Sequence, residues 1–367
     1  MNVVFAGGGT GGHLYPAIAI ADALRDRANV LFVGSADRLE ATLVPKAGYP
    51  LATVASGPLV RTLSPAIVTT GFANLAGTVQ AIRILVRARP DIVIATGGYV
   101  CFPVVVAARI LNELRMLHAK IALLEPNAQP GLTNRVLAPL VDEVWGAFAA
   151  GDPGFSGKYV YTGIPVRESL RDLPSREESI ARLGLSAKRK TLLAMGGSQG
   201  ARSINDALTS LVKSDGLPDD WQLVHVTGEK EYDRVRAALG GEQGAVRPYL
   251  HDLSDAYAAA DLVLARAGAS TLGELAATGR PAILVPYPHA AGDHQRANAE
   301  RVAQTGAAVV VEDRELAAGR LRAILADVTA PRRLEAMRLA AEQRQPNDPI
   351  ATILARVENL ASRKPTK

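Results

Sequence analysis

The stretch "NVVFAGGGTGGHLYPAIAIADAL", residues 2–24, decides the fold of the first half of the chain. A short apolar run predicts a strand over Val3 to Ala6, and apolar residues at helical spacing predict a helix over Tyr15 to Arg25. The glycine-rich turn between them would aim backbone N–H groups and the positive end of a helix at an anion. Three interpretations stay open here: a dinucleotide fingerprint, a tight strand-to-helix connection, or another phosphate chemistry.

The second half of the chain repeats this plan. The stretch "KTLLAMGGSQGARSINDAL", residues 190–208, again reads as an apolar strand, a glycine turn with a hydroxyl residue, and a helix. A single glycine pattern is weak support for a ligand site. Two such turns at matching positions favour a shared role over two unrelated tight connections.

Apolar strands alternate with helical patterns along both halves, which predicts α/β domains with parallel sheets. The other expected helices are Ala66 to Arg89 and Gly131 to Ala138. The other expected strands are Val30–Val33, Ile92–Ala95, Ile121–Leu124, Glu143–Trp145, Thr191–Met195, Gln222–Val226, Ala245–Pro248, Leu262–Ala265, Ala282–Val285 and Ala308–Val310.

The length and composition are those of a globular protein of about two domains. The chain has 367 residues, of which 48% are hydrophobic and 21% charged. A polar, charged stretch bracketed by Gly163, Pro165 and Pro174 fits a linker and a surface helix better than a core. We therefore expect one domain over residues 1–163 and a second over residues 164–345.

The only cysteine, Cys101, lies in the apolar run from Tyr99 to Ala108. This excludes a disulfide framework and predicts a small buried side chain in a reducing compartment. Met1 leads straight into a strand, so we expect no signal peptide. The longest apolar runs, Val100 to Ala108 and Ala282 to Pro288, are shorter than the roughly 18 to 20 residues that span a bilayer.

The dinucleotide interpretation needs an acidic residue about 20 residues beyond the glycines, at the end of the second strand. Asp37 is a candidate that is displaced by a few residues. His13 points elsewhere, because a helix start favours the neutral imidazole, and a neutral imidazole can accept a proton. The alternative for His13 is a capping or packing role.

At this point seven motifs together show a family resemblance that runs in one order from Asn2 to about Leu360. They are "GGGTGGHLYPAIAIADAL", "GSADRLEATLVPKAGYP", "IVIATGGYVCFPVVVAA", "NAQPGLTNR", "GIPVR", "GGSQGARSIN" and "ARAGASTLGELAATGRPAILVPYPHAAGDHQRANA". The sequence resembles the MurG family of peptidoglycan N-acetylglucosamine (GlcNAc) transferases. The resemblance implies the GT-B fold, with two Rossmann-like α/β domains facing a cleft and a C-terminal helix, within residues 346–367, that crosses back to the first domain.

The resemblance also implies an activity. Members of the family are UDP-GlcNAc-dependent hexosyltransferases that need no metal and no cofactor. They move GlcNAc, with inversion, to the C4 hydroxyl of the muramyl sugar in undecaprenyl-pyrophosphoryl-MurNAc-pentapeptide. They work at the cytoplasmic face of the bacterial inner membrane as peripheral proteins, so cell-wall synthesis proteins are candidate partners.

Residue by residue, the resemblance makes His13 the candidate general base. It makes Arg167 and Ser198 donor contacts, Leu250 the backbone position that reads uracil, and Glu274 the ribose contact. Glu274 alone could equally be a capping-box glutamate with Thr271. The UDP-GlcNAc contacts that the resemblance implies are Thr10, Gly11, Gly12, Asn127, Arg167, Ser198, Leu250, Ala269, Ser270, Thr271, Leu272, Gly273, Glu274 and Gln295.

Two segments depart from the family pattern. The family usually has H-E-Q-N where this chain has Leu124-Glu125-Pro126-Asn127, and G-N-P-V-R where it has Gly163-Ile164-Pro165-Val166-Arg167. The lost histidine and amides put in doubt a base role for the first segment and some supporting hydrogen bonds.

A lipid acceptor requires a membrane-facing surface, and Arg61 to Lys120 offers one. This segment carries seven basic and two acidic residues, a balance of +5. A stripe of apolar residues lies between the charges: Ile67, Phe72, Leu75, Val79, Ile82 and Leu85. Docking on anionic lipid is one interpretation, and a core-facing stripe with solvated arginines is the other.

Other functions stay open on the residues alone. A pI near 9.3 permits nucleic acid, but no aromatic stacking pattern or basic run supports it. A glycolipid synthase or a UDP-GlcNAc epimerase would use a different acceptor or none. A non-catalytic sugar-nucleotide-binding protein would bind UDP without turnover.

Overall fold

The computed structural model describes residues 1–59, 66–155, 157–197, 199–214, 216–239, 244–316, 320–344 and 348–362. The chain divides into two compact units. Unit 1 comprises Met1–Val166 and Asn347–Lys367, and unit 2 comprises Arg167–Pro346. The division thus follows Val166, where the sequence suggested Gly163.

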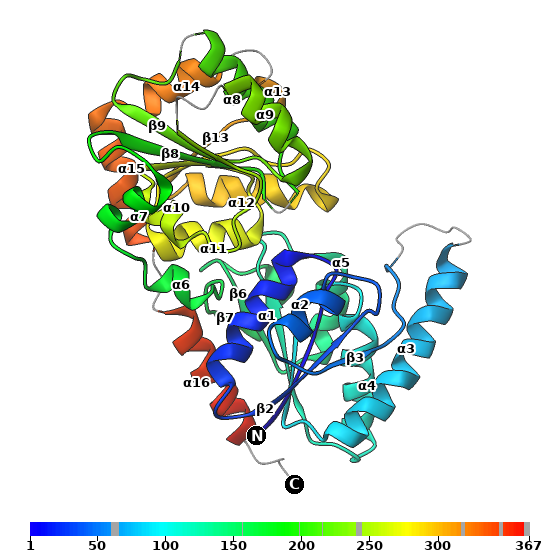
Figure 1. Ribbon diagram of the computed structural model, residues 1–367. Coiled ribbons are helices and arrows are strands. Elements are labelled where there is room, and N and C mark those ends of the chain that lie inside the picture. The colour runs from blue at the N-terminus through cyan, green and yellow to red at the C-terminus, as the bar shows by residue number, and fades with distance from the viewer. Residues whose placement is uncertain are drawn as a thin grey trace. The chain divides into compact units, whose positions relative to one another are not determined.

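Unit 1 is built on a seven-stranded sheet in the order β3-β2-β1-β4-β5-β6-β7, and every paired neighbour is parallel (Figure 1). The strands are β1 (Asn2–Gly7), β2 (Asn29–Gly34), β3 (Leu51–Thr53), β4 (Ile92–Gly97), β5 (Lys120–Glu125), β6 (Glu143–Gly146) and β7 (Tyr159–Tyr161). The helices are α1 (Gly11–Leu24), α2 (Glu40–Lys46), α3 (Ala66–Ala88), α4 (Cys101–Glu113), α5 (Leu132–Leu137), η1 (Ala138–Leu140), η2 (Pro153–Phe155) and α16 (Pro349–Ser362).

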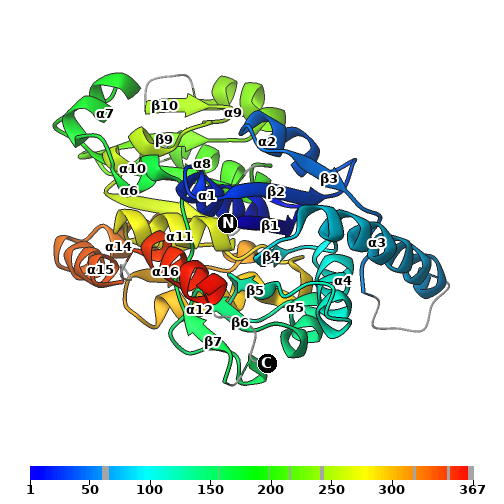
Figure 2. The same ribbon diagram turned by 90° about the horizontal axis from the view of Figure 1, so that it is seen from below.

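Helices cover both faces of this sheet, because consecutive residues of a strand point to opposite faces and nearly every residue of the inner strands is buried. In β1, Val4 and Ala6 join one buried cluster with residues of α3 and α4. Val3 and Phe5 face the other way, into a cluster with residues of α1, α2 and α16. Figure 2 shows α3 and α4 side by side.

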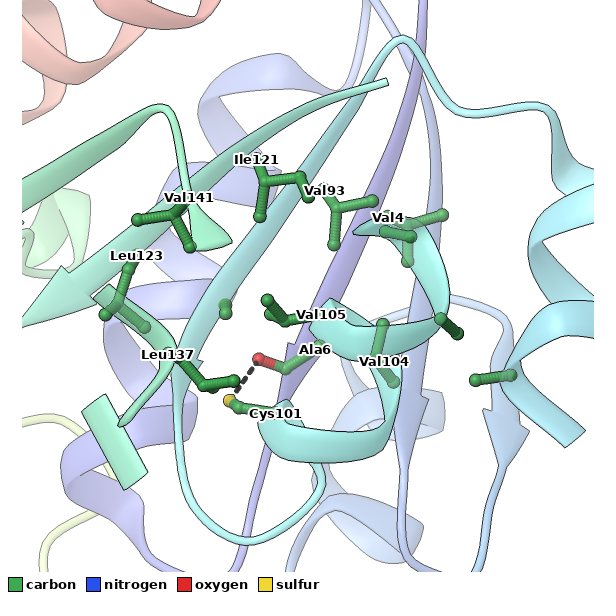
Figure 3. Close-up of a cluster of buried hydrophobic side chains, with 14 of the residues drawn as sticks. Val4, Ala6, Val93, Cys101, Val104, Val105, Ile121, Leu123, Leu137 and Val141 are labelled. Carbon is green, nitrogen blue, oxygen red and sulfur yellow. Dashed lines mark hydrogen bonds between the residues drawn. The ribbon is translucent and has the colours of Figure 1, made fainter. Parts of the chain in front are cut away.

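The single cysteine belongs to the first cluster and lies beside Ala6 and Leu137 (Figure 3). The Cys101 thiol donates to the carbonyl oxygen of Ala6 at 3.2 Å and accepts from the Gly97 amide at 3.1 Å. Burial raises the pKa of the Cys101 thiol to about 12, so the group stays protonated and can donate. It thereby ties the carboxyl end of β1 to that of β4.

The C-terminal helix α16 belongs to unit 1, although it follows all of unit 2 in the chain. Ile350, Ile353, Val357 and Leu360 are buried against the α1 side of the sheet. Arg356 forms an ion pair with the buried Glu143 of β6, and its Nε donates to Glu143 Oε2 at 2.9 Å. The indole Nε1 of Trp145 donates to the same oxygen, also at 2.9 Å.

Unit 2 has a six-stranded sheet in the order β10-β9-β8-β11-β12-β13, again with parallel neighbours. The strands are β8 (Lys190–Met195), β9 (Trp221–Val226), β10 (Gly244–Arg247), β11 (Leu262–Ala265), β12 (Ala282–Leu284) and β13 (Ala308–Val310). The helices are α6 (Glu168–Arg171), α7 (Arg176–Leu183), α8 (Arg202–Ser214), η3 (Glu229–Glu231), α9 (Tyr232–Leu239), α10 (Ser254–Ala259), α11 (Ala269–Thr278), η4 (Ala291–Asp293), α12 (His294–Ala303), α13 (Asp313–Leu316), α14 (Leu321–Val328) and α15 (Pro331–Gln343).

The predicted fold class is confirmed, since both units are parallel α/β layers of the GT-B type. Every strand expected from the sequence is present, with ends that differ by at most two residues. Two strands were missed, β3 and β7, and both are three-residue strands at the two edges of the first sheet. Such short edge strands carry little periodicity of their own.

Candidate active site

His13 lies in the first turn of α1, which begins at Gly11 with Thr10 as its N-terminal cap. Its Nδ1 is 3.0 Å from the carbonyl oxygen of Thr96, at the end of β4. A carbonyl oxygen can only accept, so in the neutral imidazole Nδ1 carries the proton and Nε2 carries the lone pair. The geometry therefore selects the tautomer that a general base at Nε2 requires.

Gly97 makes room for this arrangement. A Cβ atom at Gly97 would lie 2.2 Å from His13 Nδ1, and the backbone there has a φ of +111°. No side chain fits such a space, and L-residues rarely adopt this backbone conformation. The first glycine of the motif "ATGGYV", Gly97, therefore leaves the space in which the His13 imidazole reaches the Thr96 carbonyl at the end of β4.

Asn127 follows β5 and is held by a buried carboxylate. Glu125 Oε1 accepts from the backbone amide of Asn127 at 3.0 Å and from its Nδ2 at 3.1 Å. Glu125 Oε2 accepts from Asn134 Nδ2 at 2.8 Å. Burial raises the pKa of Glu125, and these hydrogen bonds oppose the rise. Glu125 therefore orients Asn127, while the neighbouring Leu124 points into the core.

Thr10 to His13 and Asn127 thus follow β1 and β5, which flank β4 in the sheet. Ligands of open parallel sheets bind outside the carboxyl ends of the strands. The structure places these predicted residues of unit 1 along that one edge.

In unit 2, the turn after β11 opens directly into α11, whose N-terminal cap is Gly268 and whose first residue is Ala269. Because this cap is a glycine, it has no side chain that could accept from the first N–H groups of the helix. Ser270 Oγ is buried with no hydrogen-bond partner among the residues that the structure describes. The first N–H groups of a helix have no partner within the helix, so this end of α11 offers donors to an anion.

Glu274 lies one turn further along α11. Its Oε2 accepts from the hydroxyl of Tyr257 at 2.9 Å. Burial raises the pKa of Glu274 to about 7, although the Tyr257 hydrogen bond and the charge of Arg167 lower it. The capping-box interpretation is wrong, because the helix begins at Ala269 and Thr271 does not cap it.

Arg167 contacts the backbone of the loop that contains Leu250. Arg167 Nη1 donates to the carbonyl oxygen of His251 at 2.7 Å, next to Leu250 in the loop between β10 and α10. Ser169 Oγ donates to Asp252 Oδ1 at 3.1 Å in the same loop. The arginine therefore holds the loop in which the family resemblance implies a contact with the nucleobase.

Gln295 is the second residue of α12, and its Oε1 accepts from the Tyr287 amide at 3.0 Å. A Cβ atom at Gly268 would lie 4.0 Å from its Nε2, so the amide borders the start of α11. Ser198 lies outside the described residues. Its neighbours Gly197 and Gly200 both have positive φ, +80° and +74°, as a tight glycine turn needs.

Sequence reasoning missed two buried groups beside these residues, Tyr257 and Glu40. Tyr257 is a fully buried partner of Glu274, and nothing in the local pattern identifies it. Glu40 is 1% exposed and accepts from the amide of Gly9. Asp37, the candidate ribose contact of a dinucleotide site, is exposed instead. The acid that reaches the glycine turn is Glu40, at the start of α2.

No three His, Cys, Asp or Glu side chains gather as a metal site within the part of the chain that the structure describes.

Comparisons with known proteins agree over both units. The glycosyltransferase family 28 N-terminal domain matches residues 3–145, and the C-terminal domain of the same family matches residues 191–352. A UDP-N-acetylglucosamine–N-acetylmuramyl-(pentapeptide) pyrophosphoryl-undecaprenol N-acetylglucosamine transferase from Desulforudis audaxviator is 39% identical over 99% of both chains. Its counterpart from Moorella thermoacetica is 43% identical over 93% of this chain and 94% of its own.

Among solved structures, MurG of Acinetobacter baumannii superposes with a TM-score of 0.78 at 27% identity. The match covers 97% of this chain and 99% of that one. With relatives of this identity along nearly its whole length, the chain belongs to the MurG family of N-acetylglucosamine transferases.

Proposed function

We propose that this protein transfers GlcNAc from UDP-GlcNAc to undecaprenyl-pyrophosphoryl-MurNAc-pentapeptide in peptidoglycan synthesis. The printed names of its relatives describe this reaction. The observation in this chain that carries the proposal is the His13 imidazole, which is fixed as the Nδ1–H tautomer by the Thr96 carbonyl. A binding protein without turnover would have no need of a base in a selected tautomer.

In the proposed reaction, His13 Nε2 takes the proton of the C4 hydroxyl of the muramyl sugar. The hydroxyl oxygen forms a bond to C1 of GlcNAc while the bond from C1 to the diphosphate oxygen breaks. UDP leaves with that electron pair, and attack on the opposite face inverts the configuration at C1. His13 then releases its proton to solvent.

Unit 2 would hold the nucleotide. The start of α11, with Ala269, Ser270, Thr271, Leu272 and Gly273, would supply N–H and hydroxyl donors to the diphosphate, and Ser198 would add to them. Glu274 would accept from the ribose hydroxyls in place of the Tyr257 hydroxyl, and the Leu250 loop braced by Arg167 would take the uracil. Gln295 would contact the GlcNAc, as would Asn127 with Thr10, Gly11 and Gly12 of unit 1.

A transfer assay with labelled UDP-GlcNAc and the lipid acceptor tests this proposal. His13→Ala and His13→Gln are both expected to lower kcat by about 100-fold to 10,000-fold, since neither side chain is a base. His118→Ala, at an exposed histidine of the same unit, is the matched control and should keep wild-type rates.

Three outcomes would contradict parts of the proposal. Donor turnover in the absence of the lipid acceptor would favour an epimerase. UDP binding without transfer by the wild-type protein would favour a non-catalytic role. A rate that falls when a chelator is added would contradict the metal-independent mechanism that we propose.

We also propose that unit 1 docks on an anionic membrane through α3. Phe72 and Leu75 are 70% and 63% exposed, and Val68 and Val79 are exposed on the same helix. Arg83, Arg87 and Arg89 are exposed near its end. Apolar side chains would enter the lipid interface while arginines pair with lipid phosphates.

Only part of the apolar stripe expected from the sequence faces solvent. Ile82 and Leu85 pack into the core of unit 1, so that part of the expected lipid-facing stripe was wrong. Arg61 and the side chain of Ile67 lie outside what the structure describes. In the described part of the chain, no helix combines the length and apolar character that crossing a bilayer requires. The proposal is therefore peripheral attachment, at the cytoplasmic face of the plasma membrane.

A further inference from the structure

The first glycine turn already contains an anion, which is supplied by the protein itself. Glu40, the first residue of α2, is 1% exposed. Its Oε2 accepts from the amide of Gly9 at 2.8 Å, and its Oε1 accepts from the amide of Ser35 at 2.9 Å. Each carboxylate oxygen therefore takes one backbone N–H, from the turns after β1 and β2.

Two glycines leave the space that this carboxylate fills. A Cβ atom at Gly8 would lie 2.2 Å from Glu40 Oε1, and one at Gly34 would lie 2.5 Å from its Cγ. Real Cβ atoms do not approach other atoms so closely. The glycines at the ends of β1 and β2 are thus matched to the side chain of Glu40.

The Glu40 carboxylate lies between the turns after β1 and β2, which is the region where a Rossmann site binds its dinucleotide cofactor. In such sites the amides of the first glycine turn hold a pyrophosphate, and an acid after β2 holds a ribose. Here the Gly9 amide is bonded to a fixed carboxylate, whose charge would repel a phosphate brought to the same turn.

We infer that Glu40 is a positioning residue that fixes the turn carrying Thr10 and His13, and that it keeps phosphate groups out of this turn. The anchored turn leads directly into α1, whose third residue is His13. The part of the inference about catalysis depends on the proposed function. The part about anion occupancy does not, and can be measured without turnover.

Glu40→Ala should remove the internal anion and leave a cavity beside the Gly9 and Ser35 amides. We expect kcat to fall about 100-fold, with the KM for UDP-GlcNAc changed less than threefold, because most of the proposed donor contacts, including all of those to the nucleotide, lie in unit 2. Formate or acetate at millimolar concentration should restore at least a tenth of the lost rate. His13→Ala should show no such rescue, and Asp26→Ala, at an exposed acid of unit 1, should behave as wild type.

Amide NMR supplies the readout that does not depend on activity. In Glu40→Ala, formate and inorganic phosphate should shift the Gly9 and Ser35 amide signals with saturation, and in the wild type they should not. Shifts without any effect on kcat would leave the occupancy intact and overturn the positioning role. Equal phosphate shifts in wild type and variant would overturn the exclusion.

Glu40→Gln covers the case in which Glu40→Ala does not fold. An amide has one acceptor oxygen, so it can satisfy only one of the two N–H groups, and its own NH₂ faces the other. We expect a loss of kcat of about tenfold or more in a folded protein. Wild-type kcat in Glu40→Gln, with unchanged Gly9 and Ser35 signals, would overturn the inference.

Discussion

At the scale of single residues, the site depends on polar groups whose partners are distant in sequence. His13 is 83 residues from Thr96, and Glu40 is 31 residues from Gly9. The sequence could mark His13, because it follows a glycine turn at a helix start. It could not show that Nδ1 would meet a carbonyl or that Gly97 would make the room, since both depend on how β1 and β4 pair.

Glu274 gives a prediction about pH. Its pKa of about 7 means that the carboxyl is largely protonated at pH 6 and ionised at pH 8. If the ionised form accepts from the ribose, the KM for UDP-GlcNAc should fall about tenfold from pH 6 to pH 8. Glu274→Gln should abolish this dependence and keep KM high. Steady-state kinetics at fixed acceptor concentration measure this pH dependence of KM. Glu300→Gln, at an exposed acid of α12, is the control.

The same residue links pH to the stability of the free protein. A carboxyl whose pKa is raised by folding stabilises the folded state most below its ordinary value, near 4.5, and loses this contribution as the pH rises through about 7. Glu274→Gln lacks the ionisation, so at pH 8 its free energy of unfolding should exceed that of wild type by on the order of 1–2 kcal/mol after solvent screening, and it should unfold at a higher temperature. Equal melting temperatures at pH 8 would argue against a buried, ionised Glu274.

At the scale of elements, α16 shows how one helix can be held by apolar packing and one buried charge pair. Its buried side chains face the α1 side of the sheet, and Arg356 reaches Glu143 over 213 residues of sequence. The family resemblance implied both the helix and the side on which it packs. The sequence did not indicate that Glu143 of β6 is the buried partner of Arg356.

Arg356→Ala should destabilise unit 1 by about 2 kcal/mol, because it removes the cation that forms an ion pair with the buried Glu143 carboxylate. Chemical denaturation measures the loss. Arg27→Ala removes a second ion pair of α16, with Glu358, whose side chains are 62% and 61% exposed. That control should cost less than about 1 kcal/mol. Equal losses in the two variants would show that burial of Glu143 does not matter.

At the scale of the whole molecule, the proposed membrane contact concerns unit 1 alone. Replacing Arg83, Arg87 and Arg89 by Ala should abolish co-sedimentation with vesicles that contain anionic lipid, because each arginine near such a surface contributes about 1 kcal/mol. Phe72→Ser with Leu75→Ser should weaken binding to the same vesicles without changing the charge.

The matched control replaces arginines of unit 2 that are exposed, such as Arg322 and Arg332, by Ala. It removes positive charge but should leave vesicle binding unchanged. Undiminished binding of the α3 variants would contradict the docking proposal, whereas transfer to an acceptor in detergent should be preserved in all of them.

The sequence by itself determined two parallel α/β layers, the two glycine turns and the family, because strand and helix periodicities and turn residues are local signals. It also placed Phe72, Leu75 and Val79 on a candidate surface, but not which stripe residues the core would take. Only the tertiary structure decided that Ile82 and Leu85 pack into the core, that Glu40 rather than Asp37 reaches the glycine turn, and that Thr96 selects the tautomer of His13. Those contacts join segments brought together by strand order, and no local pattern specifies which side chain will fill the space that a glycine leaves.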